Sequence, residues 1–353
     1  MIKVFDFFSG CGGTSSGFST AGMEIVFGLD IDRDSAATFQ VNFPKASFYL
    51  GDISGFDPFS LTELIGVDDI TLFCGCAPCQ PFSKQNSNKK LRDPRAKMLD
   101  EFSRMVEACL PDFVFVENVP GMQRVSTSRN SRFSRFKTKL RKLGYTLDVK
   151  IVPALWYGVP QSRERLVLLA SRRGELLIPG ASHGDGLLPI STVADWISHL
   201  EPLEAGHQSA QDPDHQAMAL SAVNRERIIL TPEGGGRNDW PERLVLQCHE
   251  GHRGHGDVYG RLSWHRPAAA MTTRCISYSN GRFGHPSQDR AISLREAACL
   301  QTFPRGYRFV GTLTSKARQV GNAVPPLMAQ KIGESIMRSV LERLPQREAG
   351  VRA

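Results

Sequence analysis

The chain has 353 residues, of which 41% are apolar and 22% charged, and it carries a formal net charge of +7. That length allows one large α/β domain and a smaller second one, while the mild basic excess weakly favours a polyanionic partner. The sequence has no apolar run of about 18 residues, no signal-peptide pattern and only irregularly spaced cysteines, which argues against a membrane-spanning or secreted protein and favours the cytoplasm.

The first half of the chain alternates short apolar runs with helix-like stretches. The runs that we predict to be buried strands are residues 3–8, 24–30, 46–50, 70–75, 113–118, 146–152 and 165–171. Strands that alternate with helices predict an α/β fold with a doubly wound, mostly parallel, Rossmann-like sheet. From about 172 to 290, frequent Gly, Pro and His predict a smaller, loop-rich domain, and residues 325–344 predict a helix that packs back on the sheet.

A glycine loop follows the first predicted strand, in the segment "FFSGCGG", and holds Gly10, Gly12 and Gly13. Such a loop lets the backbone approach a ligand closely, although Ser15 stands where a dinucleotide fingerprint requires a third glycine. Asp30 ends the second strand and Asp52 follows the third, where carboxylates can accept hydrogen bonds from ribose and adenine. These features predict an adenosine-containing cofactor. The alternative is that both aspartates are turn or capping residues.

Three cysteines lie close together in "CGCAPC", residues 74–79. A zinc site needs a second ligand pair, which the sequence lacks nearby, so we expect no metal site and predict that Cys74 is a buried thiol. Cys79 lies between Pro78 and Pro81 at the carboxyl end of a strand, where α/β active sites form. The next strand ends at Glu117, so Cys79 and Glu117 are candidates for a nucleophile and a proton donor. A capping or salt-bridging role for Glu117 is the alternative.

In this order, the segments "FSGCGG", "PCQPFS", "ENV", "QSRER" and "GNAVPP" resemble the bacterial-type DNA (cytosine-5-)-methyltransferase family over residues 3–173 and 261–335. The resemblance implies a catalytic S-adenosylmethionine-dependent methyltransferase domain, residues 1–174 and 315–353, and a target-recognition domain with its hinge, residues 175–314. It implies methyl transfer to carbon 5 of a flipped-out cytosine in a specific double-stranded DNA sequence, through a covalent adduct with Cys79. The expected biological role is modification in a restriction-modification or related defence system. A monomer on DNA, with a cognate restriction endonuclease or other defence proteins as candidate partners, is expected.

The resemblance also assigns site residues. The catalytic residues that it implies are Cys79, Glu117, Asn118, Arg163 and Arg165, with the two arginines on one strand face. The cofactor-binding residues that it implies are Phe8, Gly10, Cys11, Gly12, Gly13, Asp30, Ile31, Asp52, Ile53, Pro78 and Asn322. The DNA-binding residues that it implies are Ser83, Lys84 and Thr272.

Two departures from the family pattern concern Ile31, which replaces a common bulky aromatic residue, and Cys299, which replaces a common arginine. An RNA (tRNA) cytosine-5 methyltransferase is an alternative, disfavoured because its Cys-Phe-Thr signature is absent and a long variable domain is present. A non-catalytic DNA-binding relative is a second alternative, which the intact Cys79, Glu117 and Arg165 disfavour. Along the basic run at 128–142 and just after it, Phe133, Phe136, Leu140 and Leu143 fall on one helical face, so we predict an ordinary amphipathic helix rather than a DNA-binding patch.

Overall fold

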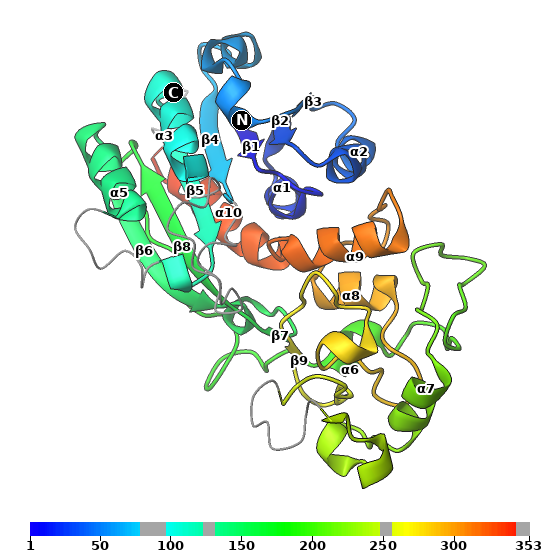
Figure 1. Cartoon of the computed structure of the whole chain (residues 1–353). Helices are drawn as coiled ribbons and strands as arrows, with labels where there is room; N and C mark the ends of the chain where they lie inside the picture. Colours follow the sequence, from blue (N-terminus) through cyan, green and yellow to red (C-terminus); the bar gives the residue numbers. More distant parts are fainter. Residues whose placement is uncertain (78–96, 123–130, 248–255, 344–353) are drawn as a thin grey trace, which may run out of the picture.

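A seven-stranded sheet forms the centre of the computed structural model, which describes residues 1–77, 97–122, 131–247 and 256–343 (Figure 1). The strands lie in the order β3-β2-β1-β4-β5-β8-β6. Their bounds are β1 Ile2–Phe7, β2 Glu24–Asp30, β3 Ser47–Leu50, β4 Ile70–Gly75, β5 Phe113–Asn118, β6 Thr146–Pro153 and β8 Glu164–Ser171. The five strands from β3 to β5 pair in parallel, and β8 pairs antiparallel with β5 and β6. The predicted strands and the mostly parallel, doubly wound α/β sheet are therefore confirmed.

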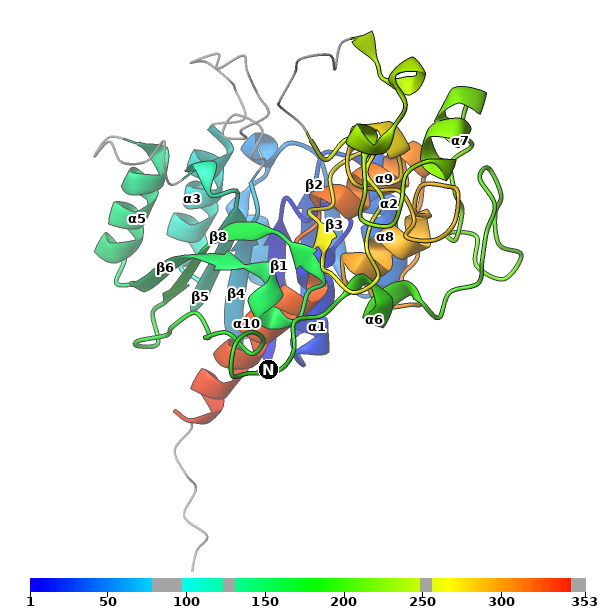
Figure 2. The same cartoon turned by 90° about the horizontal axis from the view of Figure 1, so that it is seen from below.

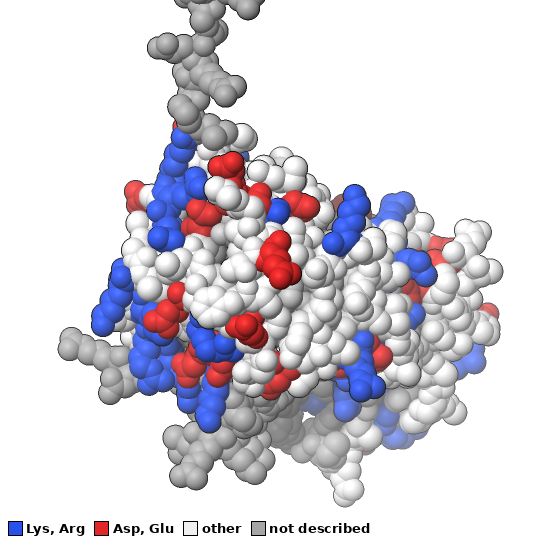
Figure 3. Space-filling model, turned by 90° about the horizontal axis from the view of Figure 1, so that it is seen from above, with Lys and Arg blue, Asp and Glu red and all other residues white. Residues whose placement is uncertain are grey.

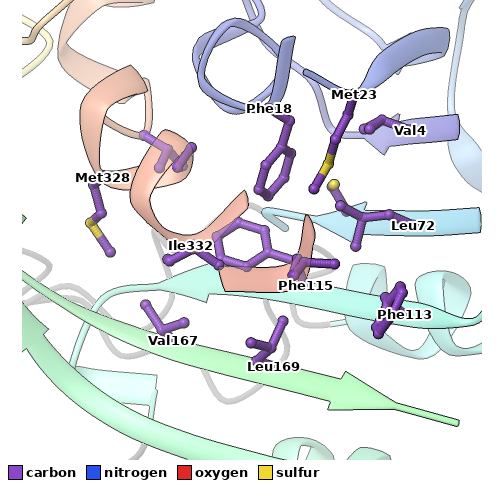
Figure 4. Packing of buried hydrophobic residues seen from close by; sticks show 14 of the residues in the cluster. Val4, Phe18, Met23, Leu72, Phe113, Phe115, Val167, Leu169, Met328 and Ile332 are labelled. Atoms are coloured by element: carbon purple, nitrogen blue, oxygen red, sulfur yellow. The ribbon is translucent and has the colours of Figure 1, made fainter. Parts of the chain in front are cut away.

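Helices cover both faces of this sheet (Figure 2). One face packs against α1 (Gly13–Thr20), α2 (Arg33–Asn42) and α10 (Pro326–Leu341), and the other packs against α3 (Met98–Cys109) and α5 (Arg132–Lys142). Side chains alternate along β5, so Phe115 faces the first layer and Val116 the second. In the first layer, Phe18 meets Phe115 edge to face at 5.4 Å between ring centroids, and Ile332 of α10 packs beside them (Figure 4). The C-terminal helix thus packs back on the sheet, as predicted.

Residues 132–142 of the basic run form the amphipathic helix α5, whereas residues 128–130 lie outside the described residues. Phe133, Phe136 and Leu140 of α5 are buried, and Leu143 packs against the same cluster. On the exposed side, Lys139 pairs with Glu107 of α3 at 2.6 Å. Figure 3 shows basic and acidic side chains interspersed on this face of the molecule. The prediction that the apolar residues belong to the core is confirmed.

The remaining elements are short and form the second part of the molecule together with long loops (Figure 1). The α-helices and strands there or at its boundary are β7 Gln161–Ser162, α6 Val193–Ile197, α7 Ala222–Ile229, β9 Ala268–Ala269, α8 Leu294–Leu300 and α9 Leu313–Asn322. The 3₁₀ turns of the described chain include η1 Ile53–Gly55, η2 Pro58–Leu64, η5 Ala154–Tyr157, η6 Arg237–Asp239, η7 Glu242–Leu244 and η9 Tyr278–Asn280. Within the described ranges, no helix is long and apolar enough to cross a membrane.

Two features join this second part to the sheet domain. β7 pairs in parallel with β9, in a register that places Gln161 beside Ala268. A shared apolar cluster contains Val193 of α6, Leu300 of α8, Val320 of α9 and Cys11 of the glycine loop. Before that junction, Leu176 and Ile178 still belong to the core of the sheet domain, so the chain leaves that core only after Ile178.

Candidate active site

A cavity of about 510 Å³ lies at the carboxyl ends of β1, β2 and β4, where ligands bind in open α/β sheets. The predicted cofactor residues that line it are Phe8, Gly10, Cys11, Gly13, Asp30, Ile31, Asp52, Ile53 and Asn322. Gly12 lies just behind the wall: its φ is 88°, and a Cβ there would come within 2.7 Å of the Phe43 ring and the Tyr307 hydroxyl. Pro78 lies outside the described residues. In all, residues from seven separate segments of the chain line this cavity.

The glycine loop enters this cavity in a strained conformation. Phe8, Gly10 and Gly12 all have positive φ angles, of 60°, 53° and 88°. For Phe8, which has a side chain, this conformation costs about 1–3 kcal/mol and persists only where its surroundings hold it. The loop is held by the backbone N–H of Ser9, which donates to the Leu29 carbonyl at 3.0 Å, and by Asp30.

Asp30 organises two loops at once. Its Oδ2 accepts a hydrogen bond from the Gly10 N–H at 2.8 Å, and its Oδ1 accepts one from the Asp32 N–H at 2.9 Å. Each oxygen keeps a further lone pair for a ligand hydroxyl. Burial raises the pKa of this carboxyl, and its backbone hydrogen bonds oppose that shift.

The other carboxylate, Asp52, is exposed and caps the turn η1 by accepting from the Ser54 N–H at 2.8 Å. The hydrogen bonds from Ser54 lower the pKa of Asp52. The contacts of Asp52 are therefore those of a capping residue, which was the alternative to a cofactor-binding role, although Asp52 also lines the cavity. Beside it, the Ile31 side chain is 67% exposed and offers the cavity an apolar surface.

Sequence reasoning missed several cavity residues. The most informative is Arg318 of α9, whose Nη2 lies 2.8 Å from Oδ2 of Asp32, so that an ion pair joins two of the segments that line the cavity. Arg318 precedes Asn322 by one helical turn, and this i, i+4 spacing could have indicated that both face the cavity. The other missed lining residues include Thr14, Ser35, Cys76, Met98, Gln319 and Val324.

The candidate acid, Glu117, lies at the end of β5 and lines the same cavity. Its Oε1 is 2.6 Å from Nε of Arg165 on the neighbouring strand β8, and the two side chains are only 10% and 15% exposed. The Arg165 guanidinium also donates to the Glu164 carbonyl at 2.7 Å. A carboxylate fixed by a cation at the wall of a cavity can hydrogen-bond to, or exchange a proton with, a bound ring.

Asn118, the last residue of β5, holds the chain at the point where it leaves β4. Its Nδ2 donates to the Ala77 carbonyl at 2.9 Å, and its Oδ1 accepts from the Val119 N–H at 2.9 Å. Ala77 is the last described residue before the segment that contains the candidate nucleophile. Cys79, Ser83 and Lys84 lie outside the described residues.

The two other cysteines of the cluster are described. Cys74 is fully buried in the sheet, which confirms the prediction of a core thiol. Cys76 lines the cavity, and its sulfur is 3.6 Å from the Thr14 hydroxyl. Burial raises the pKa of both thiols well above its usual value, so neither is a ready thiolate. Over the ranges that the structure covers, no group of three or more His, Cys, Asp or Glu side chains is arranged to hold a metal ion.

Arg163 has different surroundings from Arg165. It is 4% exposed, and its guanidinium donates to the carbonyls of Met271 at 3.2 Å and Gly321 at 3.2–3.3 Å. Arg163 lies between β7 and β8 rather than within a strand. The predicted strand face shared with Arg165 therefore does not determine the position of the Arg163 side chain. Thr272 lies against the same helix end, where a Cβ on Gly321 would come within 2.0 Å of the Thr272 carbonyl oxygen.

Comparisons with known proteins agree on one family. The model of the family described as C-5 cytosine-specific DNA methylase matches residues 2–338. The chain is 39% identical to the Type II methylase M.HgiDII of Herpetosiphon aurantiacus, over 98% of this chain and 97% of that protein. It is 32% identical to the Type II methyltransferase M1.HphI of Haemophilus parahaemolyticus, over 96% and 87%.

Solved structures show the same fold. A prophage-encoded protein of E. coli, described as a DNA modification methyltransferase, matches with a TM-score of 0.76 and 22% identity over 97% of this chain and 100% of that one. A Spodoptera frugiperda DNMT2 variant matches with a TM-score of 0.63 and 18% identity, over 97% and 100%. At these identities the likeness concerns the fold alone.

Proposed function

The chain belongs to the C-5 cytosine-specific DNA methylase family, and from this premise we propose that it methylates carbon 5 of a flipped-out cytosine within a specific double-stranded DNA sequence, through a covalent adduct with Cys79. The observation that carries the proposal is the meeting of three features at one place. At the carboxyl ends of β4 and β5 lie the cavity and the Glu117–Arg165 pair. The same place holds Ala77, bound by Asn118, from which the chain continues to Cys79.

The cavity suits S-adenosylmethionine. Asp30 offers free lone pairs for ribose hydroxyls, and the exposed Ile31 side chain offers an apolar surface for adenine. The glycine loop allows the backbone to approach the ligand closely, because Gly10 has open space where a Cβ would point. When bound there, S-adenosylmethionine supplies an electrophilic methyl group.

The residues of the chain make cytosine reactive. Carbon 5 of the ring is a weak nucleophile, so the Cys79 thiolate first adds its electron pair to carbon 6 and breaks the conjugation of the ring. Glu117 in its protonated form, held by Arg165, donates a hydrogen bond or its proton to N3 and so neutralises the negative charge that this addition moves into the ring. Carbon 5 can then take the methyl group. A base, which solvent can supply, then removes the carbon 5 proton: the carbon 5–carbon 6 double bond re-forms, the carbon 6–sulfur bond breaks with Cys79 leaving as thiolate, and N3 returns its proton to Glu117.

The target base must leave the duplex to reach this site, because carbon 5 and carbon 6 are otherwise enclosed in the base stack. The relatives named Type II methyltransferases favour duplex DNA over tRNA, and they favour a modification role beside a restriction endonuclease. We propose that the enzyme acts as a monomer in the cytoplasm. The intact Glu117–Arg165 pair argues against a non-catalytic relative.

We also propose that the two domains have different roles. The catalytic domain, residues 1–174 and 315–353, carries the chemistry, and residues 175–314 recognise the DNA site. The cavity and the Glu117–Arg165 pair belong to the first set. Phosphate contacts position a protein on DNA, whereas base-edge contacts specify the sequence. A chimera with residues 180–260 from a relative of different specificity should therefore adopt the relative's site. A folded chimera that still marks the original site would contradict this division.

The covalent step can be trapped directly. In duplex DNA that carries 5-fluorocytosine, fluorine replaces the carbon 5 hydrogen and cannot leave as the proton does, so the adduct should persist in denaturing electrophoresis when S-adenosylmethionine is present. Cys79→Ser should form no adduct, whereas the matched variant Cys76→Ser should still form one. An adduct that survives in Cys79→Ser, or depends on Cys76, would refute the assignment of the nucleophile.

A further inference from the structure

Three buried polar side chains form a cluster at the boundary between the sheet domain and the second part of the chain. Gln161 of β7 and Gln301, which follows α8, are both 0% exposed, and Arg163 lies beside them. Gln161 Nε2 donates to Gln301 Oε1 at 2.6 Å, and Arg163 Nη1 lies 3.5 Å from the same oxygen. We call these three residues the amide junction. Figure 1 shows β7, β9, α8 and α9 converging on this region.

On one side, the amide junction holds the segment that closes the cavity. Gln301 Nε2 donates to the Ala323 carbonyl at 2.5 Å, and Arg163 donates to the Gly321 carbonyl at 3.2–3.3 Å. The residue between these two carbonyls is Asn322, and both Asn322 and Ala323 line the cavity. The position of the cavity wall is therefore fixed by side chains that lie outside it.

On the other side, the amide junction holds the segment that leads to Thr272. Gln161 Oε1 accepts from the Met271 N–H at 3.0 Å, and Arg163 donates to the Met271 carbonyl at 3.2 Å. Both polar groups of the Met271 backbone are thus bound by the amide junction. The next residue, Thr272, packs its backbone on Gly321 so closely that no Cβ would fit between them.

We propose that Gln301 is a positioning residue that couples occupancy of the cofactor cavity to the placement of the Met271–Thr272 segment, through Gln161 and Arg163. The inference rests on the proposed function, in which the cavity binds S-adenosylmethionine and Thr272 faces DNA. Gln301 touches neither ligand, and it acts through the backbone groups that it holds.

The physical reason is that the residues of the amide junction cannot move independently of the segments that they hold. Protein interiors are close-packed, and a buried hydrogen bond that is stretched or broken leaves a polar group unsatisfied. A shift of residues 321–323 on ligand binding must therefore move Gln301 and Arg163, and with them Met271. By thermodynamic linkage, if the cofactor changes the affinity for DNA through this segment, DNA must change the affinity for the cofactor by the same factor.

Hydrogen exchange tests this coupling without DNA. In the wild-type chain, S-adenosylhomocysteine should slow exchange at the amides of residues 268–275, which include the Met271 N–H that donates to Gln161. In Gln301→Met, the ligand should still bind, but the protection of 268–275 should fall to less than half. Tyr145→Phe is the matched control, since it also removes one buried hydrogen bond, to the Pro111 carbonyl, far from the amide junction. That control should keep the full protection.

A second variant guards against a Gln301→Met chain that does not fold. Gln301→Glu keeps the shape and the acceptor for Gln161 but replaces the donor to Ala323, and it should lose the same ligand-induced protection. Equal protection in wild type and either folded variant would overturn the inference, as would ligand binding without any protection of 268–275 in wild type. Failure of wild type to bind S-adenosylhomocysteine in calorimetry would instead refute the cofactor assignment, and the inference would fall with it.

Discussion

The Nε atom of Arg165 lies 2.6 Å from Oε1 of Glu117, and this ion pair joins strands β8 and β5 at the wall of the cavity. Because both side chains are largely buried, the pair fixes the direction in which the carboxyl group faces the cavity. The arginine is also a fixed positive charge beside the place where negative charge would develop on a cytosine ring.

Glu117→Gln should therefore lower kcat for DNA methylation by about 10²–10⁴-fold, the range for loss of a general acid. The affinity for S-adenosylmethionine should change little, because the amide keeps the shape of the side chain. Arg165→Lys should also lower kcat, since an ammonium group cannot reproduce the Nε–H contact in the same geometry. Single-turnover kinetics with saturating cofactor measures the methyl-transfer step in both variants, and a single-turnover rate within twofold of wild type in Glu117→Gln would exclude the proposed acid.

Asp30→Ala should weaken binding of S-adenosylmethionine by about 1–3 kcal/mol, because it removes a ligand acceptor and leaves the N–H groups of Gly10 and Asp32 without their acceptor. Asp57→Ala is the matched control: Asp57 also caps a turn, accepting from the Phe59 N–H, but does not line the cavity. Calorimetry with both variants decides the point. Equal affinity for S-adenosylmethionine in Asp30→Ala and wild type would show that Asp30 only holds the loop and does not bind the cofactor.

The Arg318–Asp32 ion pair joins two segments that line the cavity, so we expect its loss to speed both entry and release of the cofactor. Arg318→Ala and Asp32→Asn should each raise the dissociation rate of S-adenosylhomocysteine several-fold, and the double variant should add little to either. Asn at position 32 can keep the side-chain oxygen that accepts from the Ser35 N–H, so the start of α2 is preserved. Stability should change by less than about 1 kcal/mol, as for other exposed ion pairs. Stopped-flow release rates that simply multiply in the double variant would show that the two residues act independently.

The buried Asp6 predicts a pH dependence of stability. Burial raises the pKa of its carboxyl to about 7 from the usual 3.8, and Ser15 donates to its Oδ2 at 2.6 Å. The folded chain therefore binds this proton more tightly than the unfolded chain, so the stabilisation is complete below pH 3.8 and is lost as pH rises toward about 7.

Asp6→Asn should remove that loss, because the neutral amide keeps an oxygen for Ser15. Relative to wild type, the free energy of unfolding of the variant should rise by on the order of 2–4 kcal/mol between pH 4 and pH 8. Urea denaturation at both pH values gives the comparison. A difference between the two proteins that is independent of pH would show that the Asp6 carboxyl does not titrate between these values.

The central strands β4, β5 and β8 were predictable because each is a nearly continuous apolar run bounded by turn residues, a pattern that burial on both faces imposes. The side-chain partners were harder to predict. Arg163 and Arg165 are two positions apart, yet one binds carbonyls at the amide junction and the other binds Glu117, because the strand order and the break between β7 and β8 decide which way each side chain turns.

Contacts between distant segments were likewise outside the reach of sequence patterns. Arg318 meets Asp32 only because α9 docks across the carboxyl end of the sheet, 286 positions further along the chain. Gln301 and Gln161 are hydrogen-bonded to each other although they lie 140 positions apart in the chain. Cys299, noted as a departure from the family pattern, is buried in the cluster that joins α6, α8 and α9, where an apolar side chain suffices.

The central claim is that this chain methylates cytosine carbon 5 in duplex DNA at one sequence through Cys79. The most direct measurement treats an unmethylated plasmid and, separately, a tRNA pool with the purified chain and S-adenosylmethionine, and then maps 5-methylcytosine at single-base resolution. The account predicts methylation at one cytosine of every copy of a single short DNA sequence, none in the tRNA, and none in either substrate with Cys79→Ser. Methylation of tRNA, or undiminished methylation of DNA by Cys79→Ser, would contradict it.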